Sequence, residues 1–263
     1  MPAFENRLIE IQGSQPPGLI ADGMTRALAG GKRIRPRLVL SVNHPAELSG
    51  VLLDFAAALE MVHCCSLVLD DLPCMDDAEE RRGEQCLHLS HSEAEATLIA
   101  FSLLARSFDV LITGKSEEQP LRARLVQKLS RAIGGGGMAE GQAQELRGHS
   151  ANTEDISRLK TASLFSVATE GVGIALQCSP TQQQTLKELG EVLGLAFQAL
   201  DDLNDGDGEK RESLESALKQ HFERCQTLIE SLDNSFEGYR DLLAELKTHS
   251  ENLLKPPPAA EAS

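Results

Sequence analysis

The sequence predicts an all-α protein, a single-domain helical bundle around a central cavity. Ala and Leu are abundant and β-branched runs are short, a composition that favours helix over strand. Apolar and amphipathic segments alternate with breaks marked by Gly and Pro, as in a chain of packed helices. We find no internal repeat and no convincing strand.

The breaks divide the chain into predicted helices. The first should lie within residues 1–17, because Gly13 and the Pro16-Pro17 pair end it. Pro73 should end the long apolar helix 46–69, and Asn152 or Thr153 should cap the helix that begins at residue 154. The remaining helices are expected at 19–28, 32–42, 92–112, 121–133, 138–146, 154–176, 181–205 and 209–254. Residues 1–255 would form the domain, and 256–263 a disordered tail.

Composition limits the possible functions. The chain has 263 residues, 41% hydrophobic and 25% charged, which is typical of a globular domain. Its net charge of −15 argues against binding to nucleic acid or to anionic membranes. We expect no signal peptide and no stable membrane span. The 6 cysteines are expected to be reduced thiols in a cytoplasmic protein.

An acidic cluster follows the apolar run that ends at Leu69. Its four aspartates, with the two arginines that follow, are Asp70, Asp71, Asp76, Asp77, Arg81 and Arg82. Carboxylates at the end of a buried helix repel one another unless cations lie between them, and Mg²⁺ prefers such oxygen ligands. Guanidinium groups bind phosphate oxygens bidentately. A pair of aspartates alone is more often a solvated helix end.

A second acidic cluster favours a binding site over a solvated helix end as the interpretation of the first cluster. Asp201 and Asp205 lie on one helix face, with Asp202 beside them, and they also end a long apolar run. Two acidic clusters that each end a buried helix suggest two facing walls of one metal–diphosphate site.

With these motifs the chain resembles the trans-isoprenyl diphosphate synthases, the farnesyl and geranylgeranyl diphosphate synthase type. The resemblance rests on D-D-x4-D followed by R-R-G, and on F-Q-x-x-D-D-x-x-D. It runs from about Gly30 to Asp205 and includes Gly30-Gly31-Lys32-Arg33-Ile34-Arg35-Pro36, His63, Gly141-Gln142 and Lys160-Thr161. The resemblance implies the isoprenoid synthase fold, and by analogy a homodimer.

The resemblance also implies a reaction and its residues. Isopentenyl diphosphate would condense head-to-tail with an allylic diphosphate, with Mg²⁺ as cofactor. The implied metal ligands are Asp70, Asp71, Asp76, Asp201, Asp202 and Asp205, and Asp70, Asp71, Asp76, Lys160 and Asp201 are the implied catalytic residues. Arg81, Lys160, Thr161, Gln198 and Lys210 would bind the allylic substrate. Lys32, Arg35, His63 and Arg82 would bind the isopentenyl diphosphate.

Product length is expected to depend on the side chains below the first aspartate. In the family the residues four and five positions before it form the floor under the growing chain. Here they are Ser66 and Cys65, with Cys64 beside them. Because these side chains are small, the sequence favours a C20 product, geranylgeranyl diphosphate, over C15 farnesyl diphosphate.

The chain departs from the family in three places. Glu84 to His88 replaces the usual Gly-Lys-Pro-Thr, Phe101-Ser102 replaces Gly-Asp, and the lysine-bearing loop after the second acidic motif is shortened to Gly206–Lys210. The shortening after residue 205 favours an alternative, a catalytically weak subunit that modulates a partner prenyltransferase. A terpene cyclase is disfavoured by Lys32 and Arg35. A zinc site built from Cys64, Cys65, Cys74, Cys86 and His88 is disfavoured because paired C-x-x-C spacing is missing.

Overall fold

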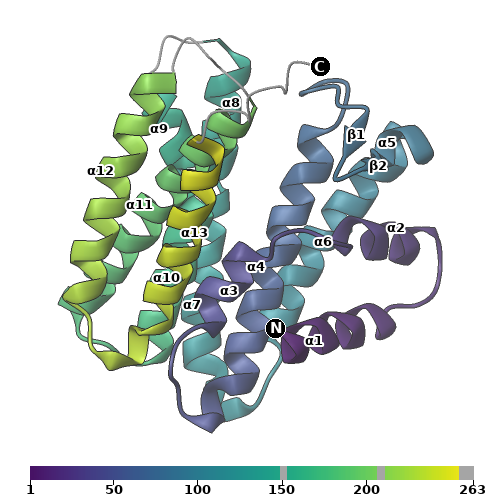
Figure 1. The fold of residues 1–263 in the computed structure, drawn as a ribbon. Helices are drawn as coiled ribbons and strands as arrows, with labels where there is room; N and C mark the ends of the chain where they lie inside the picture. Colours follow the sequence, from purple (N-terminus) through teal and green to yellow (C-terminus); the bar gives the residue numbers. More distant parts are fainter. Residues whose placement is uncertain (149–152, 206–210, 255–263) are drawn as a thin grey trace, which may run out of the picture.

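The protein folds into an all-α bundle, seen in a computed structural model that describes residues 1–148, 153–205 and 211–254 (Figure 1). The helices are α1 (Pro2–Gly13), α2 (Leu19–Leu28), α3 (Ile34–Leu40), α4 (Ser49–Asp70), α5 (Leu87–Ser90), α6 (Glu93–Ile112), α7 (Gln119–Ile133), α8 (Met138–Leu146), α9 (Thr153–Ser157), α10 (Ser163–Ala175), α11 (Pro180–Asn204), α12 (Arg211–Glu230) and α13 (Gly238–Leu254). Short 3₁₀ turns lie at Ala46–Leu48, Ser116–Glu118 and Asn234–Phe236. The predicted fold class is confirmed.

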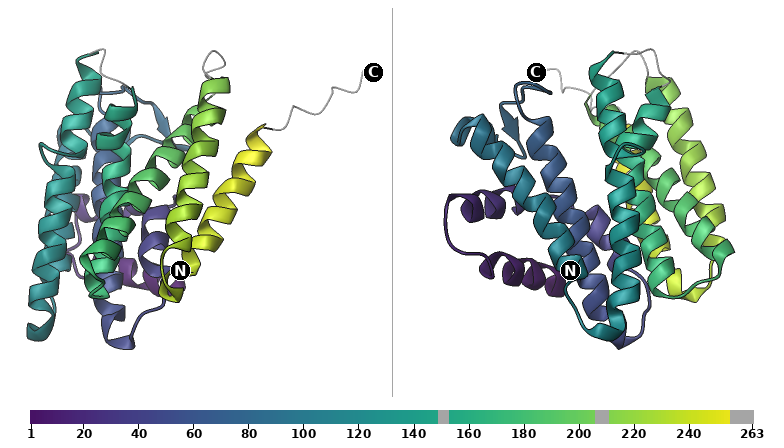
Figure 2. Two further views of the ribbon diagram at one scale, coloured as in Figure 1. Left: turned by 90° about the vertical axis from the view of Figure 1, so that its left-hand side faces the viewer. Right: turned by 180° about the vertical axis from the view of Figure 1, so that it is seen from behind.

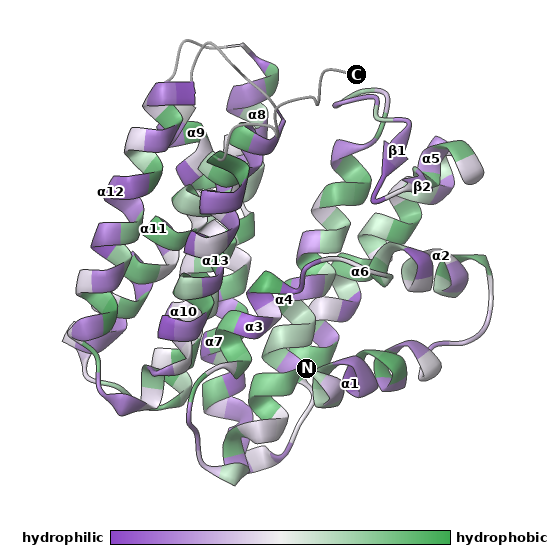
Figure 3. Cartoon of the chain, in the orientation of Figure 1, coloured by the Kyte–Doolittle hydropathy of each residue, from purple (hydrophilic) through white to green (hydrophobic). Residues whose placement is uncertain are grey.

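Helix α4 lies at the centre of the bundle. It packs most extensively on α6, and it also contacts α3 and α10, while α10 and α11 form the second extensively packed pair. Ala56, Ala57 and Ala58 are fully buried, which lets neighbouring helices approach α4 closely. Helices α1 and α2 lie across this core (Figure 2). Figure 3 shows the contrast between the largely apolar α4 and the hydrophilic outer face of α12.

Two buried carboxylates on α4 bind arginines from other elements. Asp54 accepts a 2.8 Å hydrogen bond from Arg7 of α1 and lies 2.9 Å from Nη1 of Arg122 on α7. Glu60, 2% exposed, lies 2.7 Å from Nη1 of Arg33, the residue before α3. Because a buried charge is costly without a partner, these contacts fix α1, α7 and the start of α3 against α4.

Most of the predicted helices are present, with shifted ends. The helix expected at 32–42 begins at Ile34, since Gly30, Gly31 and Arg33 adopt positive φ angles. The helix expected at 154–176 is interrupted by a π-helical turn at Arg158–Ala162. The segment 209–254 forms two helices rather than one, because the chain turns between α12 and α13.

The expectation of no strand was wrong. Glu80–Arg81 (β1) and Glu84–Gln85 (β2) pair antiparallel in a minimal hairpin. Its two central residues, Arg82 and Gly83, have φ angles of 59° and 79°. Positive φ at both positions is the geometry of a tight hairpin turn, so the strands follow from the turn rather than from strand propensity. Asn152, the predicted tail 256–263 and the shortened loop 206–210 lie outside the described residues.

One helix in the described part of the chain is long and apolar enough to cross a membrane. The segment Ala46–Asp70 has a mean hydropathy of 1.8, but 78% of its apolar window is buried inside the fold. A second candidate arises only if Glu93–Ile112 and Ser116–Leu146, bent by 105°, are taken together. The core helix of a globular protein has these same properties, so the absence of a stable membrane span stays a prediction.

Candidate active site

The first acidic wall is the C-terminal end of α4 and the loop that follows. Asp70 is half-buried, and its burial raises the pKa of the carboxyl to about 6, with repulsion from Asp76 acting in the same direction. The backbone N–H of Asp76 donates to the Asp70 carbonyl at 2.9 Å, which folds the loop back onto the helix end. Asp71 is 5% exposed and accepts a 2.6 Å hydrogen bond from Nε of Arg81.

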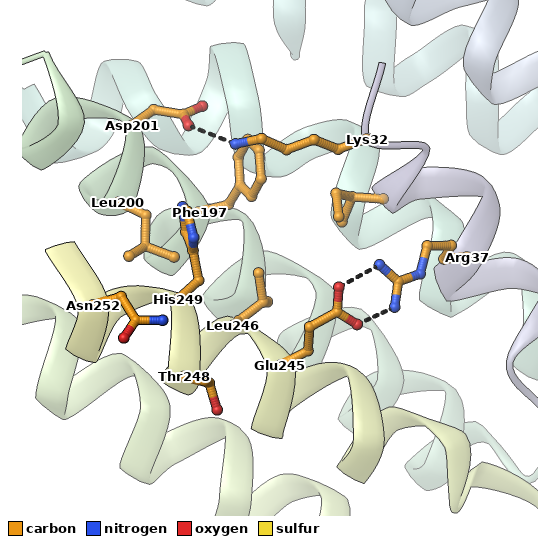
Figure 4. A pocket seen from close by; sticks show the side chains of 11 residues that line it. Lys32, Arg37, Phe197, Leu200, Asp201, Glu245, Leu246, Thr248, His249 and Asn252 are labelled. Atoms are coloured by element: carbon orange, nitrogen blue, oxygen red, sulfur yellow. Dashed lines mark hydrogen bonds and ion pairs between the residues drawn. The ribbon is translucent and has the colours of Figure 1, made fainter. Parts of the chain in front are cut away.

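The second acidic wall is the end of α11. Burial raises the pKa of Asp201, and repulsion from Asp205 and Asp202 adds to the shift. Nζ of Lys32 lies 3.8 Å from Oδ1 of Asp201 and above the Phe197 ring (Figure 4). Oδ1 of Asp202 accepts a 2.8 Å hydrogen bond from Gln198, one turn earlier.

The donor set of the two walls fits a hard divalent cation that is shared with a ligand. All six candidate groups are carboxylates, and burial together with repulsion from neighbouring carboxylates raises the pKa values of Asp70 and Asp201, so a bound cation would stabilise their charged forms. Within residues 1–148, 153–205 and 211–254, no three His, Cys, Asp or Glu side chains converge on one preformed metal position. Mg²⁺ accepts one or two carboxylates when phosphate oxygens and water complete its shell, so a diphosphate between the walls would supply the remaining ligands.

A cationic group lies deeper, near α3. Arg35 is 8% exposed; its guanidinium stacks on Phe165 with 4.7 Å to the ring centroid, and its Nε has no hydrogen-bond partner. Burial lowers the pKa of Arg35 to about 10. Burial, together with the charges of Arg35 and Arg82, lowers the pKa of His63 well below its usual range, so this imidazole is neutral at pH 7. A buried cation without a carboxylate partner is a suitable receptor for a multiply charged anion.

Gly31 allows two further cations, Lys32 on the glycine loop and Arg82 on the hairpin turn, to lie close together beside this cationic group. A Cβ on Gly31, whose φ is 92°, would stand 2.8 Å from the Arg82 guanidinium. Arg82 in turn donates to the carbonyl of Ala29 at 3.3 Å. The hairpin turn therefore packs directly on the glycine loop that carries Lys32.

The π-helical turn carries the remaining predicted contacts. Lys160 forms an ion pair with Glu145 on α8 and lowers the pKa of Asp70 through its charge. Thr161 donates to Gln198 at 2.6 Å. Glu145 was not among the predicted residues, although its position four residues from Gly141 on one helix face is visible in the sequence. Lys210 lies outside the described residues.

A cavity of about 580 Å³ adjoins the second wall, between α3, α11 and α13. Lys32, Phe197 and Asp201 line its inner side, and Leu246 and His249 of α13 line the outer side (Figure 4). Arg37 on α3 and Glu245 on α13 form an ion pair that fixes α13 over the cavity. The last described helix of the chain is thus part of the site's surroundings, which its charged sequence did not suggest.

The chain matches known proteins over most of its length. Residues 18–220 match the polyprenyl synthetase family model. Geranylgeranyl diphosphate synthases from Pantoea ananas and Cereibacter sphaeroides are 39% and 40% identical, over 68% and 74% of this chain. A farnesyl diphosphate synthase from Geobacillus stearothermophilus is 36% identical over 75% of it.

A solved structure of similar length shares the fold. The geranyltransferase from Legionella pneumophila superposes with a TM-score of 0.84 and 29% identity, covering 95% of both chains. The match with the Pantoea protein spans only 62% of that relative, and with the Cereibacter protein 67%. Family model, relatives and fold agree, and the chain belongs to the polyprenyl synthetase family.

Proposed function

We propose that this protein is a short-chain trans-prenyltransferase that condenses isopentenyl diphosphate with an allylic diphosphate. The observation that carries the proposal is the arrangement of the site: two carboxylate walls on α4 and α11, and a cationic group in which the buried Arg35 has no ion pair among the described residues. An enzyme that acts on a single diphosphate needs one diphosphate-binding site, whereas an enzyme that condenses two diphosphates needs two such sites. The relatives named above are geranylgeranyl and farnesyl diphosphate synthases.

The carboxylates would bind Mg²⁺, and through the metal they would bind the allylic diphosphate. Asp70, Asp71 and Asp76 on one wall, and Asp201, Asp202 and Asp205 on the other, would hold the metal. When bound, Mg²⁺ neutralises the diphosphate and makes it a better leaving group. Arg81 and Lys160 would add positive charge around that leaving group, which would stabilise the charge that develops as the C–O bond breaks.

The cationic group would bind the diphosphate of the second substrate. Lys32, Arg35 and Arg82 supply charge, and the neutral His63 supplies one N–H donor. Holding this diphosphate still places the double bond for attack on the allylic cation, a proximity effect. The released diphosphate is a suitable acceptor for the proton that is then lost, so no protein base is assigned.

We also propose geranylgeranyl diphosphate as the product. Cys65 is 5% exposed, and the charge of Asp70 contributes to its raised pKa, so it lies below the first wall. Cys64 instead lies among the charges of Glu60 and Arg82. A small side chain at position 65 leaves room for a longer prenyl tail, whereas an aromatic ring would limit it.

A homodimer is proposed from an apolar stripe on α6. Leu98, Phe101, Ala105, Phe108 and Ile112 follow the 3-4-3-4 spacing of a coiled-coil seam. Leu98, Phe101 and Ile112 are 55%, 68% and 41% exposed. A stripe with this spacing is suited to the same helix of a second copy.

A cytoplasmic location is proposed from the thiols. All 6 cysteines lie in the described residues and are free, which is typical of a reducing compartment.

The test is incubation of the purified protein with Mg²⁺, isopentenyl diphosphate and, in turn, the C5, C10 and C15 allylic diphosphates, with products read by mass spectrometry. Asp70→Ala and Asp201→Ala serve as matched inactive controls. Elongated prenyl diphosphates from the unmodified protein alone support the proposal. Products that form only when a second synthase is added would favour the modulating subunit, for which the short connection between Asp205 and Arg211 is the supporting feature.

A further inference from the structure

The π-helical turn at Arg158–Ala162 is held tightly between two helices. A Cβ on Gly141 of α8 would stand 2.6 Å from the backbone nitrogen of Lys160. A Cβ on Gly194 of α11 would stand 2.5 Å from Cα of Ala162. Both glycines are therefore required for the turn to approach α8 and α11 so closely, and its position is fixed on two sides.

Consecutive residues of this turn bind partners on different helices. Lys160 forms an ion pair with Glu145 on α8. Thr161 acts on the second wall, because its hydroxyl donates to Oε1 of Gln198 at 2.6 Å. Nε2 of Gln198 then donates to Oδ1 of Asp202 at 2.8 Å.

This chain of hydrogen bonds has one direction. A carboxylate only accepts, so it requires the amide nitrogen of Gln198 to face it. The amide oxygen then faces Thr161, whose hydroxyl must donate. Rotation of the amide by 180° would place its oxygen against the Asp202 carboxylate, which is repulsive. The carboxylate therefore sets the orientation of the amide, and the Thr161 hydroxyl, which can donate or accept, stabilises that orientation by donating to the amide oxygen.

We propose that Thr161 and Gln198 are positioning residues that hold the Asp202 carboxylate in the orientation in which it binds a divalent cation together with a diphosphate. The proposal rests on the proposed function, because it takes Asp202 as part of the metal–diphosphate site. It differs from a role in contacting substrate: Oε1 and one N–H of Gln198 are already engaged by protein partners. Among the described residues Oδ2 of Asp202 has no hydrogen-bond partner, so it is the oxygen that would bind the cation.

The test compares Thr161→Val, which removes the donor at nearly constant volume, with Thr161→Ser, which keeps it. Mn²⁺ serves as the spectroscopic probe, and its affinity is measured by electron paramagnetic resonance with inorganic diphosphate present. The loss of one hydrogen bond corresponds to a weakening of about three- to tenfold for Thr161→Val. Thr161→Ser should stay within about twofold of the unmodified protein, since its hydroxyl can make the same bond. Thermal unfolding midpoints of both variants should be similar.

Equal Mn²⁺ affinity in Thr161→Val and the unmodified protein would overturn the proposal, as would an equal loss in both variants. If Thr161→Val does not fold, Gln198→Met provides the same measurement, with weakened Mn²⁺ binding expected and unchanged binding overturning the idea. Product formation is assayed separately. A protein that makes no product but loses Mn²⁺ affinity in Thr161→Val would refute the proposed function and keep the positioning role.

Discussion

Replacement of Arg35 by methionine should weaken diphosphate binding without weakening the fold. Most buried charges in this protein have partners, and removal of one would leave the other unpaired. Arg35 is different, because it has a stacking contact with Phe165 but no ion pair in the described structure. The lowered pKa of Arg35 reflects the free-energy cost of burying its charge in the folded state.

A fall in the pKa from 12.5 to about 10 corresponds to roughly 3 kcal/mol of destabilisation of the charged group in the folded state. Because the folded pKa of this cation is depressed, the cost is fully present below pH 10 and declines only as pH rises above it. Arg35→Met removes this cost but loses the cation–π contact, worth about 0.5–2 kcal/mol. The free energy of unfolding should therefore rise by about 1–2.5 kcal/mol at pH 7.

Arg35→Met should weaken the free energy of diphosphate binding by more than it raises the free energy of unfolding. One charge-assisted hydrogen bond contributes about 1.5–3 kcal/mol, so the affinity for inorganic diphosphate should fall about ten- to hundredfold. Urea unfolding followed by circular dichroism measures the first effect and calorimetric titration the second. Arg37→Met is the matched control, because Arg37 lies on the same helix but is paired with Glu245, and it should leave diphosphate affinity unchanged. A destabilised Arg35→Met, or one that binds diphosphate normally, would refute this reasoning.

Three further predictions concern metal, product and assembly. EDTA should abolish prenyl transfer and Mg²⁺ restore it, and Asp201→Ala should lower turnover by orders of magnitude with an unchanged circular dichroism spectrum; full turnover in metal-free buffer would contradict the role of the walls. Cys65→Phe should shift the product from C20 toward C15 in mass spectra, and a C20 product from this variant would place the floor elsewhere. Phe101→Lys should convert a dimer into a monomer in light-scattering measurements, because the charge falls in an apolar seam; a retained dimer mass would show that α6 is not the interface.

The fold could be predicted well from the sequence because its signals are local. Gly and Pro mark the helix ends, and long apolar runs gave α4, α6, α10 and α11. The hairpin was missed since two-residue strands have no periodicity, and only Arg82-Gly83 signals the turn. The π-helical turn was missed because it depends on close approach by Gly141 and Gly194, which are distant in the sequence.

The aspartates and the Arg81-Arg82 pair could be predicted from their clustering after long apolar runs, and the other residues of the candidate site only through motif resemblance. The mutual arrangement of these residues could not be predicted. The sequence gives no indication that Arg81 binds Asp71 or that Glu145 pairs with Lys160, because both contacts depend on how loops and helices meet in space. The position of α13 beside the second wall is also a tertiary feature. Its charged pattern indicates a solvated helix, and only its packing on α12 and α11, with the Arg37–Glu245 ion pair to α3, places Leu246 and His249 at the cavity.

The two buried carboxylates of α4 have a consequence during synthesis of the chain on the ribosome. As it emerges, this segment is long and apolar enough to be recognised as a membrane-spanning helix. An aspartate near the middle of such a helix costs about 2.5–3.5 kcal/mol in translocon-mediated insertion. Asp54 and Glu60 lie within this run, and their arginine partners come from separate segments of the chain. The residues that fix α4 in the finished bundle therefore also oppose its diversion into a lipid bilayer before the bundle exists.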